Sequence, residues 1–271
     1  MQWSLCLSVL CGLQSLSVDG FLPFPLKSDS VRAIPASDRY ARQTARVAIH
    51  YLNYLAASPN NLLILGEVTK ATVKGVPGIG HKYYIEFTTD DFKTNQKVGT
   101  CFGTVFFQSH KPRPAVNVNC TNNNSQNQIN DDDYNLYEKI KQQSKPITAN
   151  EIPDSFGHID PSHEPLRDLA LAGSSLVMWE KSTEKMHYYM AQVKSVKQWA
   201  RRDDFIDFDY NILLHEIPTQ EIVPCHMRVI WYPGEPLKVK YECFPLSRSE
   251  ESEEGSSGSH SEEGSASYGN F

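Results

Sequence analysis

The chain has 271 residues and a formal net charge of −6 at pH 7, and this length predicts one large or two medium domains. The charge is uneven: residues 247–271 hold six Glu and one Arg, a net of −5, and Asp19 accounts for the rest. The body between them is neutral, so we expect it to have no basic face and no nucleic-acid partner.

The N-terminus carries an uncharged apolar run over residues 3–18. A membrane span needs about 20 apolar residues, so the run is too short for one. We interpret residues 1–20 as a signal peptide, with a buried N-terminal segment as the alternative. The sequence therefore predicts a secreted, extracellular protein without a membrane anchor.

The next segment, residues 21–122, is predicted to be a domain with one helix followed by four strands. Apolar residues recur at helical spacing between Ser37, the predicted N-terminal cap, and Pro59, which stops the helix. Strand-like runs follow at 62–73, 81–89, 98–108 and 115–121. In the second run, the residues expected to face the core are Tyr83, Ile85 and Phe87.

Residues 123–160 are predicted to form a linker with a short helix. Its first part is polar and turn-rich, which is typical of a solvated loop. Asp131-Asp132-Asp133 is interpreted as an acidic cap for the helix that follows, and contact with a cation is the alternative. The helix is expected to contain Tyr134, Tyr137, Ile140 and Lys141 and to end before Pro146.

Residues 161–246 repeat the order of the first domain. A helix is predicted over 162–183, although Gly173 is an unusual residue inside it. Strands are predicted at 185–199, 204–214, 221–232 and 237–244. The alternation of apolar and polar residues predicts which side chains face the core: Phe208, Tyr210, Ile212, Leu214, Met227, Val229 and Trp231. The side chains predicted to face solvent are Asp207, Asp209 and Asn211. The whole chain is thus predicted to be α+β, with a helix wrapped by a four-stranded antiparallel sheet in each half.

Four cysteines remain after the signal peptide: Cys101, Cys120, Cys225 and Cys243. They fall on the third and fourth strands of each half with nearly equal spacing. Adjacent antiparallel strands hold Cα atoms at disulfide distance, which favours the pairs Cys101–Cys120 and Cys225–Cys243. Four unrelated buried thiols are the alternative.

The segment 213–227 contains His215-Glu216, the opening of the zinc-protease motif H-E-x-x-H. The second ligand position holds Thr219, and Pro218 would break the helix on which the motif depends. Other motifs typical of catalytic, metal or cofactor sites are also missing from the sequence. We therefore expect no enzyme activity, no metal site and no cofactor, and we interpret residues 215–221 as an exposed turn.

Two sets of modification sites are predicted. Asn119 and Asn123 begin glycosylation sequons, and their closeness suggests that at most one is used. Residues 247–271 are predicted to be a disordered acidic tail in which Ser249, Ser252 and Ser261 precede acidic pairs that favour phosphorylation. The tail is either solubilising or a multivalent contact with calcium carbonate mineral.

Three pieces of sequence, VPGIGHKYYIEF, EIPDSFG and above all RRDDFIDFDYNILLHEIPTQEIVP, resemble the latexin family. The resemblance runs from about Ala36 to Pro236. It implies two tandem cystatin-like domains joined by a linker helix. It also implies inhibition of zinc metallocarboxypeptidases of the A/B group by closure of the funnel-shaped entrance to their active site. The signal peptide, paired cysteines and acidic tail resemble family members of the avian eggshell matrix.

The same resemblance implies which residues meet the carboxypeptidase. The inhibitory hairpin would consist of His215, Glu216, Ile217, Pro218, Thr219, Gln220 and Glu221. His215 and Gln220 match the family's residue types there, whereas Glu216, Pro218 and Thr219 depart from them. If inhibition is not retained, the alternative is a structural protein of a calcified extracellular matrix that regulates mineral growth through its tail.

Overall fold

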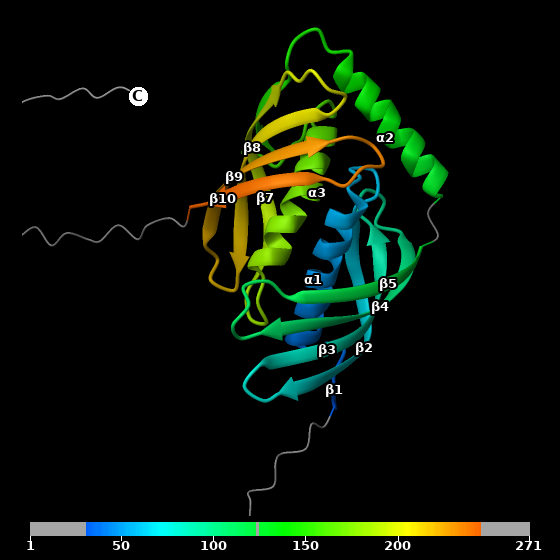
Figure 1. The fold of residues 1–271 in the computed structure, drawn as a ribbon, viewed down its shortest axis with the longest axis vertical. Helices are drawn as coiled ribbons and strands as arrows, with labels where there is room; N and C mark the ends of the chain where they lie inside the picture. Colours follow the sequence, from blue (N-terminus) through cyan, green and yellow to red (C-terminus); the bar gives the residue numbers. More distant parts are fainter. Residues whose placement is uncertain (1–30, 123–124, 245–271) are drawn as a thin grey trace, which may run out of the picture.

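The computed structural model describes residues 31–122 and 125–244, which form two antiparallel sheets, each packed on a long helix (Figure 1). The first half contains β1 (Arg32–Ile34), α1 (Arg39–Ala56), β2 (Leu63–Val76), β3 (Gly80–Asp91), β4 (Lys97–Gln108) and β5 (Ala115–Asn122). A connecting helix, α2 (Gln126–Lys141), follows. The second half contains β6 (Thr148–Ile152), α3 (Glu164–Lys181), β7 (His187–Trp199), β8 (Ile206–Ile217), β9 (Ile222–Trp231) and β10 (Lys238–Cys243).

Each sheet has five strands, one more than the sequence predicts. The orders are β1-β2-β3-β4-β5 and β10-β9-β8-β7-β6. The additional strand of the first sheet is the three-residue β1, which pairs with β2. The additional strand of the second sheet is β6, which pairs with β7 and comes from the segment predicted to be a linker. The mixed α and β composition and the antiparallel pairing agree with the prediction.

The N-terminal cap of helix α1 is one residue later in the chain than predicted. The Asp38 side chain accepts a hydrogen bond of 2.7 Å from the backbone N–H of Tyr40, so Asp38 takes the role expected of Ser37. The helix ends at Ala56, because Ala57 adopts the left-handed conformation and Pro59 follows two residues later. Its buried face lies against the first sheet.

The predicted core faces of the strands are confirmed with one exception. Tyr83, Ile85 and Phe87 are buried, as are all seven core-facing residues predicted in the second half. Asp207 was expected to face solvent but is only 1% exposed. The reason is an ion-pair network, because the guanidinium groups of Arg201 and Arg228 both reach its carboxylate, at 2.9 and 2.8 Å.

Helix α2 corrects the prediction for the linker. Residues 126–133, predicted to be a loop, form its first two turns, and Ser125 is the N-cap. The three Asp residues are therefore inside the helix rather than before it. Asp133 is buried and accepts a hydrogen bond of 2.9 Å from the Asn60 side chain, so it joins α2 to the first half of the chain.

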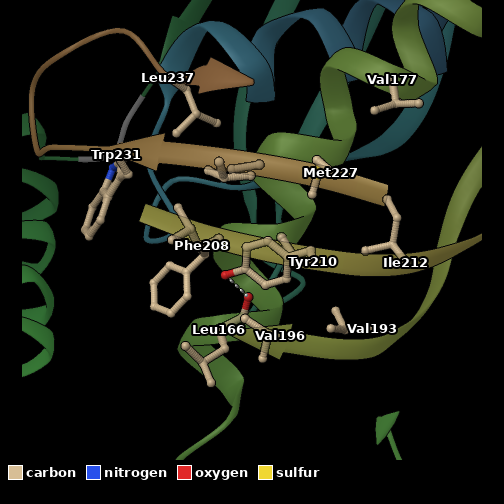
Figure 2. Packing of buried hydrophobic residues seen from close by; sticks show 14 of the residues in the cluster. Leu166, Val177, Val193, Val196, Phe208, Tyr210, Ile212, Met227, Trp231 and Leu237 are labelled. Carbon is tan, nitrogen blue, oxygen red and sulfur yellow. Dashed lines mark hydrogen bonds between the residues drawn. The ribbon is translucent and has the colours of Figure 1, made fainter. Parts of the chain in front are cut away.

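Helix α3 lies closely on the second sheet through Gly173. A Cβ atom at this position would be 2.8 Å from Cγ2 of Val229 and 3.2 Å from Sδ of Met227. Figure 2 shows the core that results, in which the Tyr210 hydroxyl donates a hydrogen bond of 3.2 Å to the carbonyl of Leu166. The unexpected glycine is thus explained by close helix–sheet packing.

The two long helices also pack on each other in the centre of the molecule (Figure 1). The Tyr51 ring of α1 meets the Trp179 ring of α3 edge-on, with 4.8 Å between centroids. Across the same interface, the indole of Trp231 donates a hydrogen bond of 2.9 Å to the carbonyl of Ala57. Trp179 and Trp231 are both buried, so the two halves share a packed interface.

Candidate functional site

The segment His215–Glu221 forms the end of the β8–β9 hairpin. His215, Glu216 and Ile217 are still in β8, so the turn itself is only Pro218–Glu221, shorter than predicted. It is closed by two backbone hydrogen bonds of 2.9 Å, from Glu216 N–H to Glu221 O and from Gln220 N–H to Glu216 O. All four turn residues are exposed, so the hairpin presents a backbone-fixed tip to solvent.

The Glu216 carboxylate is held by neighbours rather than free to act as a base. The Tyr188 hydroxyl of β7 donates a hydrogen bond of 2.5 Å to one carboxylate oxygen, and the Thr219 hydroxyl donates one of 2.8 Å to the other. Burial and then the bond to Glu216 raise the pKa of Tyr188 above its ordinary value, so it stays protonated as a donor. This clamp ties the turn to the neighbouring strand.

His215 is positioned in a similar way by an exposed tyrosine. Its Nδ1 is 2.6 Å from the Tyr189 hydroxyl, and the two rings meet edge-on with 4.9 Å between centroids. Tyr189 is 47% exposed although it is a large aromatic residue. The hairpin and the adjacent end of β7 therefore form one surface, which we call the hairpin surface, comprising Tyr188, Tyr189 and residues 215–221.

Tyr188 and Tyr189 belong to the site but were not predicted from the sequence. They follow each other in β7, and their pairing with Glu216 and His215 depends on the β7–β8 register. That register contains two irregularities further along the strands, between Met190 and Gln192 and between Val193 and Ser195. The consecutive tyrosines near the start of a predicted strand were the only available signal.

Both proposed cysteine pairs are disulfides in the structure, Cys101–Cys120 with an S–S distance of 2.03 Å and Cys225–Cys243 with one of 2.00 Å. Each joins residues directly opposite each other on neighbouring strands. The second is near the hairpin surface, because Cys225 is the fourth residue of β9, which begins at Ile222 directly after the turn. It fixes the edge strand β10 to the strand that carries the tip.

The remaining predicted sites are not brought to the hairpin. Asn119 is exposed on β5, in the other half of the chain. Residues 1–20, Asn123, Ser249, Ser252 and Ser261 lie outside the described residues. Within 31–122 and 125–244, no three His, Cys, Asp or Glu side chains are close enough together to hold a metal ion. In the same ranges no helix is both long and apolar enough to cross a membrane.

Comparison with known proteins identifies relatives over most of the chain. The family model described as Latexin matches residues 34–249. Retinoic acid receptor responder protein 1 of Homo sapiens is 44% identical over 84% of this chain and 78% of its own length. Ovocalyxin-32 of Gallus gallus is 43% identical over 83% and 81%, and Latexin of Mus musculus is 35% identical over 77% and 94%. On this evidence of sequence, the chain belongs to the latexin family.

Proposed function

We propose that this protein is a secreted inhibitor of zinc metallocarboxypeptidases of the A/B group, acting by occlusion of the active-site funnel through the hairpin surface. Membership of the latexin family supports the inhibitor class. The observation that carries the proposal is the tip itself, which is exposed, closed by backbone hydrogen bonds and clamped to β7 through Glu216. A rigid, projecting hairpin loses little conformational freedom on binding.

This mode of action requires no chemistry from the inhibitor. The hairpin has to enter the funnel and exclude substrate, and we expect His215 and Gln220 to make polar contacts with its wall. The tip is also unlike a substrate, because it is a closed turn without a free C-terminal carboxylate. We therefore expect the bound inhibitor to remain uncleaved.

The test is inhibition of a panel of A-type and B-type carboxypeptidases by the mature protein. Nanomolar to micromolar inhibition that weakens in the variant carrying His215→Ala and Gln220→Ala supports the proposal. Full carboxypeptidase activity at a high concentration of the folded protein would contradict the proposal. Electrophoresis of the mixture checks that the hairpin is not cleaved.

The proposal also includes the division of the chain into domains. We assign residues 21–122 and 161–246 to two cystatin-like domains, residues 123–160 to the linker and residues 1–20 to a signal peptide. Each sheet curved against one long helix supports that assignment. Two disulfides support an oxidising, extracellular location. Glycosylation is proposed for Asn119, which is exposed, or for Asn123.

A second function is favoured by the acidic segment 247–271 and by 43% identity to Ovocalyxin-32. In this alternative the protein is a component of a calcified eggshell matrix and binds calcium carbonate through the tail, with Ser249, Ser252 and Ser261 phosphorylated. Truncation after Pro245 should then reduce adsorption to calcite while leaving protease inhibition unchanged. Equal adsorption of both forms would remove the tail as the mineral contact.

A further inference from the structure

A cleft of about 760 Å³ lies between the two halves of the chain, next to the hairpin surface. One side is formed by α1 and the start of β2, and the other by α3 and the start of β7. Its volume is in the range of sites that bind small organic molecules. The cleft reaches the hairpin surface, since Tyr188, Tyr189 and Ile217 are among its lining residues.

The floor of the cleft is apolar. Side chains from both halves contribute to it, so an apolar ligand in the cleft would contact both halves. The aliphatic and thioether side chains of the lining include Ile49, Leu63, Leu65, Leu171, Met178 and Met190. An extended apolar ligand would bury surface on both sides and gain free energy with each methylene group.

The wall formed by α1 is basic. Arg42 and Arg46 are one helical turn apart, and the lining contains no Asp or Glu. Neither guanidinium forms an ion pair with any described residue, unlike Arg113, Arg201 and Arg228, which all pair with carboxylates. Arg42 is exposed and Arg46 is half-buried, so Arg46 in particular is a cation whose burial costs free energy unless an anion pairs with it.

The charge of the wall comes from its arginines at neutral pH. Burial first, and then the neighbouring Arg42, lower the pKa of Arg46, which nevertheless remains a guanidinium cation. Burial lowers the pKa of both His50 and His187 to about 4, so these two imidazoles are neutral. Arg167, on the opposite side, is already paired with Asp168 at 2.8 Å. Arg42 and Arg46 are therefore the groups available to a ligand.

We infer that this cleft binds a long-chain monocarboxylate, with the carboxylate on Arg42 and Arg46 and the chain over the apolar floor. A guanidinium suits a carboxylate because its planar N–H groups can bond both oxygens. A single negative charge matches a wall whose other basic groups are neutral or paired. Specificity for length follows from the floor, because each additional buried methylene raises affinity by up to about fourfold.

The experiment is calorimetric titration of the full chain with sodium dodecanoate below its micelle concentration. We expect saturable one-to-one binding, weaker binding of octanoate, and weaker binding of the neutral dodecanol. Arg46→Gln should weaken dodecanoate binding by about tenfold or more. Arg32→Gln is the matched control, because Arg32 is an exposed arginine on β1 outside the cleft, and it should leave binding unchanged.

Absence of saturable heat would overturn the inference, as would equal affinity for dodecanol and dodecanoate, which indicates apolar adsorption only. An equal effect of Arg46→Gln and Arg32→Gln would also overturn it, because that result indicates general charge attraction. A second variant, Leu171→Trp, fills the floor and should reduce binding of both chain lengths; its fold is checked by circular dichroism. None of these outcomes depends on protease inhibition.

Discussion

At the scale of single residues, Asp207 is a buried carboxylate that two arginines share. Burial alone would disfavour its ionised form, but hydrogen bonds from Arg228 and Arg201 hold its pKa below the usual value. Arg228 binds both carboxylate oxygens, at 3.0 and 2.8 Å. The pairing joins Asp207 of β8 to Arg228 of β9 and to Arg201 of the turn between β7 and β8.

Replacing Asp207 with Asn leaves two guanidinium groups without their shared partner. We expect Asp207→Asn to lower the free energy of unfolding by about 2 kcal/mol, because it weakens the charge-assisted hydrogen bonds of a buried carboxylate, although Arg228 is half-exposed and Arg201 keeps Asp203 as a partner. Asp203→Asn is the control, because Asp203 contacts the same Arg201 from an exposed position and should cost less than about 1 kcal/mol. Urea denaturation of both variants measures this difference, and equal costs would contradict it.

The alternation of residues in the strands could be predicted because the two faces of a sheet differ in solvent contact. Asp207 could not be predicted, since its partners Arg201 and Arg228 come from a turn and from the next strand. The same limit applies to the candidate site. Residues 215–221 were found from sequence, but Tyr188 and Tyr189 depend on a register that the sequence does not specify.

At the scale of elements, α3 approaches the second sheet closely at Gly173, where an added Cβ would be 2.8 Å from Cγ2 of Val229. Gly173→Ala should lower stability by about 1–3 kcal/mol because the added methyl group forces Val229 or the helix to move. This cost outweighs the helix propensity of Ala, which favours it by about 1 kcal/mol over Gly.

Gly75→Ala in β2 is the comparison, because its added Cβ would be 3.7 Å from its nearest neighbour, a ring carbon of His81. That substitution should be nearly neutral. Thermal unfolding of the two variants distinguishes them, and a Gly173→Ala protein as stable as the parent would show that α3 can shift at no cost.

The disulfide between Cys225 and Cys243 makes a separate prediction for the edge strand β10. Replacing both cysteines with Ala should lower the free energy of unfolding by about 3 kcal/mol, because the unfolded chain gains the freedom of an open loop. Hydrogen exchange should show faster opening of β10 than of β8. If β10 is protected as well as before, pairing with β9 alone is enough to hold the edge.

Other elements show where sequence patterns fail. The first turns of α2 are polar and contain three consecutive Asp residues, so no apolar period marks them. They are stabilised by contacts with distant residues, such as the hydrogen bond between Asp133 and Asn60. Strand β6 is short and contains Glu151 with φ of 52°, a conformation that ordinary strand patterns do not include. The formation of both elements therefore depends on tertiary contacts, which the local sequence pattern does not show.

At the scale of the whole molecule, we expect acid to destabilise the interface between the halves. His50 and His187 have a folded-state pKa of about 4, lowered by burial, compared with about 6.5 in an unfolded chain. Between these values the unfolded chain binds protons that the folded chain does not. Stability should therefore fall as pH decreases from about 6.5 to about 4, with no further loss from these groups below that.

The unfolding temperature measured between pH 7 and pH 4 tests this expectation. Replacing both histidines with Gln removes the titrating groups, so the curve of the double variant should be flatter than that of the parent. His110→Gln is the control, because His110 is exposed and outside the cleft between the halves, so the curve of this variant should match that of the parent. Parallel curves for the parent and the double variant would assign the acid sensitivity to other groups.

The central claim is that the hairpin surface of this latexin-family protein blocks a metallocarboxypeptidase. Its most direct test is the inhibition constant of the mature protein against an A-type enzyme, measured beside two double variants. We predict that His215→Ala with Gln220→Ala weakens inhibition at least about tenfold, the loss of two polar contacts. His158→Ala with Gln143→Ala, which makes the same changes at exposed positions outside the hairpin, should leave inhibition unaltered. Inhibition that is absent, or that both double variants reduce equally, would contradict the account.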